Sequence, residues 1–370
     1  MKKTLVALAL VAATSAQAYT FDIEETGTKI DFSGSVRLKW ESTSNKTTNL
    51  QNGNVTRRHV NEAVDNNGSR FGFRITQNLA NDFYALGRVE WRFRGKDNRG
   101  VDARSQHNFD HLYTHQLFAG IGHKQYGELT YGNMTVITDE VKQTDLPNTY
   151  SLSDGLLEFA ARRAVQYVYR GVEGLKVGGY YAGASKRGDN GLDLSNKRKD
   201  VWGLAAIYNW KLDDLQRIKL ASGISRERFE QPNSTYSITA YGLGTAYTFD
   251  KTTLGLDLER RVTKDQGAVG NKRTEHEVRT VVYQKLTKDW NAYTMYAYKV
   301  NKFDGVTADD TKRTRHQFML GTEYFVYNRG SLKLKPFVEW QATRTKDETN
   351  GVKTSKSRDY KTLVGLRAYW

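Results

Sequence analysis

Apolar and charged residues alternate along most of the chain with a period of two. In KIDFSGSVRLKWE (29–41) one face carries Ile30, Phe32, Val36, Leu38 and Trp40. In RVEWRFR (88–94) the two faces are Val89, Trp91 and Phe93 against Arg88, Glu90, Arg92 and Arg94. The end of the chain repeats the pattern with Val364, Leu366, Ala368 and Trp370. Such alternation is typical of a strand whose two faces meet different surroundings, so it predicts an all-β chain.

Links of two lengths alternate between these runs. The short ones are NLAND (78–82), VEG (172–174), FDK (249–251) and TKD (287–289). The long polar ones are residues 43–67, 185–200, 263–274 and 343–358. Strands of about 10 residues with links of mixed length divide the chain into about 16 antiparallel strands. One run, VWGLAAIYNW (201–210), is apolar on both faces, so the alternation leaves its inward side open.

The start of the chain predicts export. Lys2 and Lys3 precede an apolar run, and Ala16-Gln17-Ala18 has the small-x-small pattern that signal peptidase cuts. We therefore expect cleavage of the signal peptide, residues 1–18, and a single domain over residues 19–370. After the signal, no run approaches the ~20 apolar residues that a membrane helix needs.

The composition suits strands that cross a membrane. The chain has 22 Tyr, 15 Phe and 32 Gly but only 3 Pro, and each Pro would remove a hydrogen bond between paired strands. There is no Cys, which excludes thiol catalysis and cysteine metal sites. The formal net charge is +15 and falls by two when Lys2 and Lys3 are removed. In an exported chain these basic residues are more readily explained as contacts for lipopolysaccharide phosphates or as the lining of a passage than as a nucleic-acid-binding surface.

A barrel in lipid accounts for both faces of the strands. In lipid every backbone N–H and C=O has to be paired, and only helices and closed barrels achieve this. The apolar stripe then faces acyl chains, and at about 16 strands the charged stripe faces an aqueous interior. The pattern therefore predicts a transmembrane antiparallel β-barrel with short periplasmic turns and long extracellular loops, in the outer membrane of a Gram-negative bacterium.

Four stretches spread along the chain are GSRFGFRITQNLANDFYALGRVEWRF, YGELTYGN, AVQYVYRGVEGLKVGGYY and VGLRAYW. In order and spacing they resemble the Gram-negative general diffusion porins, most of all the major porins of Haemophilus- and Pasteurella-type bacteria. The resemblance implies a homotrimer of water-filled channels for passive diffusion of small hydrophilic solutes and ions, with no cofactor. It also implies assembly by periplasmic chaperones and the barrel-assembly machinery. The terminal aromatic residue that this machinery reads is usually Phe and is Trp370 here.

The resemblance further implies that the third long loop, residues 134–161, folds into the barrel and narrows the pore. Asn148 stands where many members of the family carry Glu. The loop acids expected at the constriction are Asp139, Glu140, Asp145, Asp154 and Glu158. The wall facing the loop is expected to carry inward bases beside Glu90, namely Arg37, Lys39, Arg70, Arg74, Arg88, Arg92 and Arg162. Given the basic balance and Asn148, we expect anion preference or weak selectivity.

Two other functions would share this fold. A substrate-selective porin would carry an inward aromatic track for sugars, and the tyrosines with inward parity are the scattered Tyr84, Tyr180 and Tyr369. A barrel with a plugged lumen would serve a structural or adhesive role and bind host partners through its loops. Because all three functions share one fold, the lumen has to distinguish them.

Catalysis and metal binding find weaker support. HNFDHLYTH places His107, His111 and His115 four apart, but along a strand they would span ~27 Å, too far to share one ion. We interpret them as ordinary loop and lumen histidines. The hydrolase alternatives, which nothing in the spacing singles out, are Ser225 with His276 and Asp257 with His316. The sequence has neither a Gly-x-Ser-x-Gly nor a His-Glu-x-x-His motif, so we expect no enzyme and no bound metal.

Overall fold

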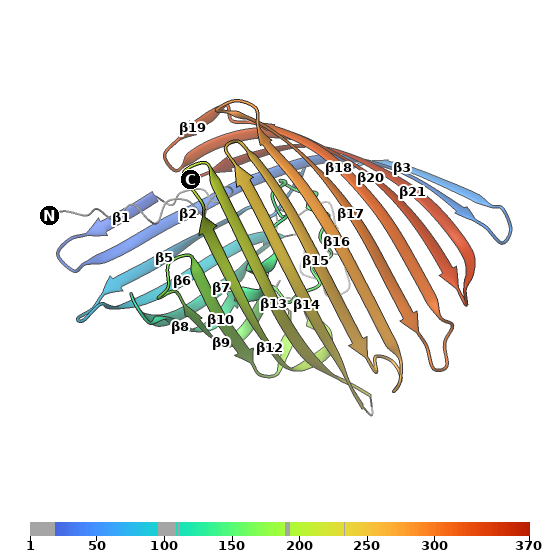
Figure 1. Ribbon diagram of the computed structural model, residues 1–370, viewed down its shortest axis with the longest axis horizontal. Helices are drawn as coiled ribbons and strands as arrows, with labels where there is room; N and C mark the ends of the chain where they lie inside the picture. The colour runs from blue at the N-terminus through green and yellow to red at the C-terminus, as the bar shows by residue number, and fades with distance from the viewer. Residues whose placement is uncertain (1–18, 95–108, 110, 189–192, 233) are drawn as a thin grey trace.

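The structure, a computed structural model, describes residues 19–94, 109, 111–188, 193–232 and 234–370. These residues form a closed antiparallel barrel of 16 strands (Figure 1), which confirms the predicted fold class. The barrel strands are β2 (Thr28–Asn49), β5 (Arg70–Asn78), β6 (Phe83–Arg94), β7 (His111–His123), β8 (Gly127–Thr135), β9 (Ala160–Tyr169), β10 (Leu175–Ala182), β12 (Asp193–Lys211), β13 (Gln216–Gln231), β14 (Ser234–Phe249), β15 (Thr252–Lys264), β16 (Lys272–Lys285), β17 (Trp290–Asp304), β18 (Thr311–Tyr324), β20 (Leu332–Thr349) and β21 (Val352–Tyr369). The shorter elements are β1 (Tyr19–Ile23), β3 (Val55–Asn61), β4 (Asp65–Asn66), β11 (Ser185–Arg187), β19 (Tyr327–Arg329) and the 3₁₀ helix η1 (Ile137–Val141).

The barrel closes between its first and last strands. Residues 35–49 of β2 pair with β21, and residues 28–35 of β2 pair with β5 on the other side. The strand β1 continues the line of β21, because Tyr19 pairs with Phe32 while Trp370 exchanges backbone hydrogen bonds with Gly34. The ring of described strands is thus complete, and its backbone groups are paired as lipid requires.

Side chains alternate between the interior and the outer surface as the pattern predicts. On β15, Asp257 is buried inside, whereas Leu258 is exposed on the outer face. On β12, which is apolar on both faces, Val201 and Ile207 are buried and Leu204 is 55% exposed. The inward side that the sequence left open is therefore the side of Val201 and Ile207.

The polar links at the extracellular end are largely paired strand rather than loop. Residues 343–358, expected as a long loop, form the ends of β20 and β21 and turn at Asn350 and Gly351, which both have positive φ. Residues 43–67 continue β2 and return as β3 and β4. Above the membrane a strand meets water on both faces, so its outward residues are polar and the apolar stripe ends although the pairing continues.

Among the links that the structure describes in full, the one between β8 and β9 runs into the barrel, as expected for the third loop. Its neck is closed by a hydrogen bond from the N–H of Val136 to the carbonyl of Phe159 at 3.0 Å. The inward loop begins with η1, and its backbone then contacts inward side chains of β15, β16 and β20. In the described part of the chain, no helix is both long and apolar enough to cross a membrane.

Candidate pore and its inward loop

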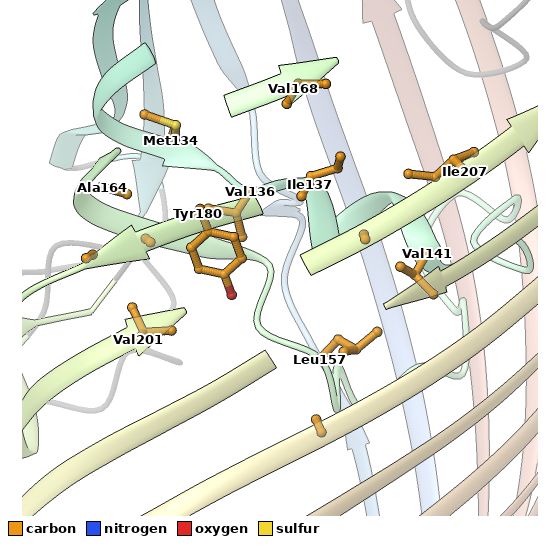
Figure 2. Close-up of a cluster of buried hydrophobic side chains, with 14 of the residues drawn as sticks. Met134, Val136, Ile137, Val141, Leu157, Ala164, Val168, Tyr180, Val201 and Ile207 are labelled. Atoms are coloured by element: carbon orange, nitrogen blue, oxygen red, sulfur yellow. The ribbon is translucent and has the colours of Figure 1, made fainter. Parts of the chain in front are cut away.

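The inward loop begins and ends on an apolar patch of the barrel wall (Figure 2). Its buried members from the loop are Val136, Ile137, Val141 and Leu157. They pack against inward residues of β9, β10 and β12, which are Ala164, Val168, Tyr180, Val201, Ala205 and Ile207. Burial of one such side chain contributes roughly 1.5–3 kcal/mol. This packing explains why β12 is apolar on both faces: one face meets lipid, and the other packs against the loop.

Asp257 on β15 holds the middle of the loop. Its carboxylate accepts hydrogen bonds from the N–H of Gln143 (2.8 Å), the N–H of Thr144 (3.0 Å) and the Thr144 hydroxyl. The fully buried Arg279 on β16 lies 2.9 Å from Asp257 and 2.7 Å from Glu259. The guanidinium also contacts Glu277, and it offsets part of this buried negative charge, which would otherwise be costly to keep out of water.

Glu339 on β20 binds three successive backbone N–H groups of the loop. The groups belong to Asn148 at 2.7 Å, Thr149 at 3.1 Å and Tyr150 at 2.8 Å. Arg367 on β21 donates to the carbonyl oxygen of Asn148. Hydrogen bonds to charged groups are roughly twice as strong as neutral ones, so this part of the loop is fixed against the wall.

Asn148 belongs to this anchor rather than to the open pore. Its side-chain amide donates to Glu323 at 2.7 Å and to the Tyr293 hydroxyl at 2.9 Å. A glutamate at this position could not donate and would meet two carboxylates. The neighbouring Tyr150 hydroxyl donates to Glu41 at 2.8 Å. Burial, together with the Glu41 carboxylate, raises the pKa of Tyr150, so the hydroxyl keeps the proton that it donates.

Most of the loop acids expected at the constriction lie against bases. Asp139 pairs with Lys142 at 2.8 Å within the loop. The wall bases beside the others are Lys176 for Glu140, Lys299 and Arg315 for Asp154, and Arg198 for Glu158. Asp145 is exposed, and the ion pairs seen among the described residues do not include it. Four of the five expected acids are therefore largely neutralised by their neighbours.

Four of the expected wall bases gather around one acid, and we call Arg37, Arg70, Arg88 and Arg92 the arginine cluster. Glu90 on β6 lies 2.7 Å from Arg92, 2.9 Å from Arg88 and 3.9 Å from Arg70. Arg37 on β2 lies over the ring of Tyr369 and within electrostatic reach of Arg92. One carboxylate thus faces four guanidinium groups on β2, β5 and β6, and the cluster keeps an excess of positive charge.

The other three expected wall bases lie apart from the arginine cluster. Their partners are Glu41 for Lys39 (3.5 Å), Glu128 for Arg74 (3.1 Å) and the carbonyl oxygen of Gly188 for Arg162 (2.6 Å). Each is held locally on its own stretch of wall. The structure therefore brings together four of the seven bases that the sequence put in one group.

The two hydrolase pairs are each divided between the faces of the barrel. Ser225 is buried inside and accepts a hydrogen bond from the N–H of Glu158, whereas His276 is exposed on the outer face. Asp257 is inside with the loop, whereas His316 is on the outer face against Tyr298. Neither pair can share a substrate, so both hydrolase alternatives were wrong.

The histidine motif forms no site in what is described. His107 and the side chain of His111 lie outside the described residues. His115 is buried, and its ring contacts Tyr113 edge-on. Within the described residues, no group of three or more His, Cys, Asp or Glu side chains is placed to hold a metal ion.

Comparison with known proteins identifies the family. The Gram-negative porin family matches residues 4–217, which is more than half of the chain. The chain belongs to this family. The Major outer membrane protein of Pasteurella multocida (strain Pm70) is 29% identical to the porin over 392 residues, with 100% of both chains covered. The resemblance read from the sequence is thus confirmed.

Solved structures share the fold. The anion-selective porin from Comamonas acidovorans matches with a TM-score of 0.66 and 15% identity, over 93% of this chain and 100% of that chain. The trimer form of OmpT, an outer membrane protein of Vibrio cholerae, matches with a TM-score of 0.65 and 14% identity, over 93% and 99% of the two chains. The porin lies in the outer membrane and forms a channel for passive diffusion.

The sequence reasoning missed the residues that hold the loop of the porin. Asp257 and Glu339 anchor its backbone, and Arg279 and Arg367 support them. Alternation could have marked Asp257 and Glu339 as interior, because apolar residues flank each of them along its strand. It could not show that they meet the loop, because pairing between a wall carboxylate and a backbone N–H leaves no pattern in the sequence of the loop.

Proposed function

We propose that the porin is a general-diffusion channel with a weak preference for anions, and that the arginine cluster sets this preference. The observation that carries the proposal is the imbalance of charge around Glu90, where one carboxylate faces four guanidinium groups. The loop acids that would oppose this charge are mostly paired with bases of their own. An excess of one sign on the wall of an aqueous passage raises the local concentration of the opposite ion.

The preference is weak for a physical reason. Salt at physiological strength screens charges over about 8 Å, and a water-filled lumen of a 16-strand barrel is wider than that over most of its length. Fixed charges therefore act mainly where the loop brings solutes close to the wall. Small hydrophilic solutes pass by diffusion, and opposed charges across the passage orient water and disfavour apolar solutes.

In this proposal the chain from residue 19 to 370 is one barrel domain, and residues 134–161 form the constriction. The arginine cluster and Glu90 line the narrow part, with Lys39, Arg74 and Arg162 on the wall around it. On the loop side, Asp145 carries the exposed acid, Glu140, Asp154 and Glu158 hold the loop through wall bases, and Asp139 pairs with Lys142 within the loop. Transport needs no cofactor and no catalytic group, so the porin has no enzymatic role.

The porin assembles as a homotrimer in this proposal, in contact with outer-membrane lipid and lipopolysaccharide. The trimer form of the Vibrio cholerae protein, which shares the fold, supports the oligomer. The row of exposed apolar side chains on the outer face supports the contact with lipid, for example Leu204, Leu243 and Leu320. Trp370 serves as the signal by which periplasmic chaperones and the barrel-assembly machinery receive the chain.

Planar-bilayer recording in a KCl gradient tests the selectivity. We expect the wild-type porin to show stepwise, non-saturating conductance. Its reversal potential should have the sign produced by a higher permeability for chloride than for potassium. Removing two members of the cluster with Arg88→Gln/Arg92→Gln leaves Glu90 with Arg37 and Arg70, so the excess positive charge of the cluster falls from three to one and the chloride-to-potassium permeability ratio should fall towards one.

The control removes the same charge far from the pore wall. Lys353 and Lys356 are exposed on β21 at the extracellular end, so Lys353→Gln/Lys356→Gln should leave the reversal potential unchanged. Strong cation selectivity in the wild type, or an equal shift in both double variants, would contradict the proposal. A folded barrel without conductance would favour a plugged lumen, and saturation by one class of sugar would favour a substrate-selective porin.

A further inference from the structure

A basic hollow of about 620 Å³ lies at the extracellular end of β8, β9, β11 and β12, where it shares Arg162 with the bases of the proposed pore wall. The residues that matter to it are Asn133, Arg162, Arg163, Lys186, Arg187 and Lys197. They come from four separate parts of the chain that the barrel brings side by side. Five of its eight lining residues are basic, and the other three are Asn133, Ala184 and Ser185.

A β-bulge shapes this hollow. Gly132 pairs with Ala164 and Met134 pairs with Ala161, so Arg162 and Arg163 together oppose the single residue Asn133. The side chain of Asn133 accepts a hydrogen bond from the N–H of Arg163 at 3.0 Å. Arg163 has a φ of 53°, in the left-handed region that an L-residue other than glycine seldom occupies. Bulges of this kind re-aim a side chain, and here the bulge turns Arg163 onto the outer surface.

The hollow lies directly above the lipid-facing surface. Val165 follows Arg163 by two residues on β9 and is exposed on the outer face. Its register partner on β10 is Tyr181, which is 57% exposed and pairs in turn with Trp202 on β12. Tyr181 is exposed and Trp202 is half-buried, and Tyr and Trp at the edge of an apolar band mark the level of the lipid headgroups. The bases therefore stand where phosphate groups of the outer leaflet would be.

The bases of the hollow exceed the acids around them. Arg187 lies 3.8 Å from Asp193, and both side chains are well exposed. Lys197 lies 2.9 Å from Glu230 on β13. Across the described residues, no carboxylate forms an ion pair with Arg163 or Lys186. A site of this kind, with three guanidinium and two ammonium groups lining an open hollow, suits a phosphate group with two or more negative charges.

We propose that this hollow binds a phosphate group of a phosphorylated glycolipid of the outer leaflet, of the lipid A type, with its acyl chains lying on Val165 and Tyr181 below. The contact with the apolar band favours a membrane-anchored phosphate over a free one, because only the lipid can use both surfaces. Arg163 and Lys186, on which the proposal turns, are not among the bases of the proposed pore, so the site does not depend on the proposed selectivity. It gives the expected contact with lipopolysaccharide a defined place on the barrel.

The test measures binding of bisphosphorylated lipid A to the full-length folded porin in detergent by native mass spectrometry. The variant is Arg163→Asn/Lys186→Gln, in which Asn tolerates the positive φ at position 163. Each base near a membrane surface contributes about 1 kcal/mol to the attraction of anionic lipid, so the variant should bind about tenfold or more weakly. Dephosphorylated lipid A should bind the wild type as weakly as it binds the variant. Inorganic phosphate at millimolar concentration should not displace the bound lipid.

Two controls keep the result decisive. Lys353→Gln/Lys356→Gln removes the same charge at the same end of the barrel and should bind within about twofold of the wild type. Single-channel conductance of the test variant should equal that of the wild type, because both replaced side chains lie on the outer face. If the test variant does not fold, Lys186→Gln/Lys197→Gln replaces it in the experiment. Equal binding by variant and wild type, or by phosphorylated and dephosphorylated lipid, would overturn the proposal. Full displacement by inorganic phosphate would overturn the lipid as the source of the phosphate.

Discussion

At the scale of the residue, Asn148 shows how its surroundings select a side chain. Its amide has two acceptors, Glu323 and the Tyr293 hydroxyl, and the N–H of the same residue is bound by Glu339. Glutamate, the residue expected from the resemblance, would add a third carboxylate to this buried place. The asparagine is therefore tied to the acids on the facing wall.

Asn148→Glu should release this part of the loop. The change replaces a donor by an acceptor between Glu323 and Glu339, and a lost hydrogen bond with a buried unsatisfied partner costs about 1–3 kcal/mol. We expect noisier single-channel current with additional conductance levels, measured in planar bilayers at neutral pH. Asn148→Gln keeps the amide donor and should stay closer to the wild type. If Asn148→Glu has wild-type conductance and no additional current noise, the side-chain amide of Asn148 does not hold the loop.

At the scale of the element, the loop is held through its backbone more than through its acids. Glu339 accepts three successive N–H groups, and Asp257 accepts two more together with a hydroxyl. A backbone N–H is present whatever the side chain, so the sequence of the loop can vary while its path stays the same. The wall carboxylates therefore decide the path, and the loop side chains decide the surface that solutes meet.

Glu339→Ala should widen the pore by freeing this segment. It leaves three buried N–H groups without an acceptor, and we expect a local loss of about 1–3 kcal/mol and a larger mean conductance. Glu339→Gln keeps two lone pairs on its carbonyl oxygen and should show a smaller change in the same direction. The measurement is single-channel conductance together with permeation of sugars of graded size in liposome swelling. If Glu339→Ala excludes the same sugars as the wild type, the Glu339 anchor does not set the pore size.

The ion pair between Asp154 and its bases predicts a pH dependence. Burial alone would raise the pKa of Asp154, but Lys299 and Arg315 outweigh this and lower the pKa below its ordinary value. A lowered pKa means that the stability contributed by the ion pairs of Asp154 is complete above the ordinary aspartate pKa of about 3.9. That stability is lost only as pH falls through the lower pKa of the folded state. Current noise should therefore stay constant from pH 7 to about pH 5. Asp154→Asn should be noisier across that range, and a step near pH 5 that Asp154→Asn lacks would contradict this.

Alternation predicted the membrane-spanning part of the strands well, and the reason is physical. The interior and the lipid impose opposite demands on successive residues, as at the buried Asp257 and the exposed Leu258 on β15. Above the membrane both faces meet water, and the demand disappears while the pairing continues. The turn at Asn350 and Gly351 was nevertheless predictable from the sequence, because Asn-Gly favours a two-residue hairpin turn with positive φ at both positions. Residues 343–358 could have been predicted as a hairpin from that dipeptide.

The candidate pore was less predictable than the strands. Parity placed Arg70, Arg88 and Arg92 on one interior stretch, and the structure gathers them around Glu90. Parity could not separate this cluster from Arg74, which lies on the same strand as Arg70 but pairs with Glu128 on β8. Distances across strands depend on register and tilt, which a single sequence does not contain. The inward path of the loop came from the resemblance alone.

At the scale of the whole molecule, the barrel depends on the seam where its two ends meet. Phe32 pairs with Tyr19, and Gly34 exchanges backbone hydrogen bonds with Trp370, so β1 and β21 lie end to end along β2. The indole of Trp370 lies over Gly34, where an added Cβ would come within 2.5 Å of the ring. A glycine that is covered by an aromatic ring from the neighbouring strand is a recurring device for fixing register. Trp370 thus both pairs with β2 where the barrel closes and is the expected assembly signal.

Gly34→Leu should therefore impair closure of the barrel. The new side chain would occupy the place of the Trp370 ring, and overpacking of this kind costs typically about 1–3 kcal/mol. We expect slower folding into lipid vesicles and a lower temperature at which the folded band disappears in a gel-shift assay. Gly183→Leu is the matched control, because a Cβ there meets nothing within 4 Å. Trp370→Phe in the Gly34→Leu background should recover part of the lost folding, since the smaller ring leaves room. If Gly34→Leu folds at the rate of Gly183→Leu, the contact between Gly34 and Trp370 does not govern closure, and assembly depends on Trp370 through its recognition alone.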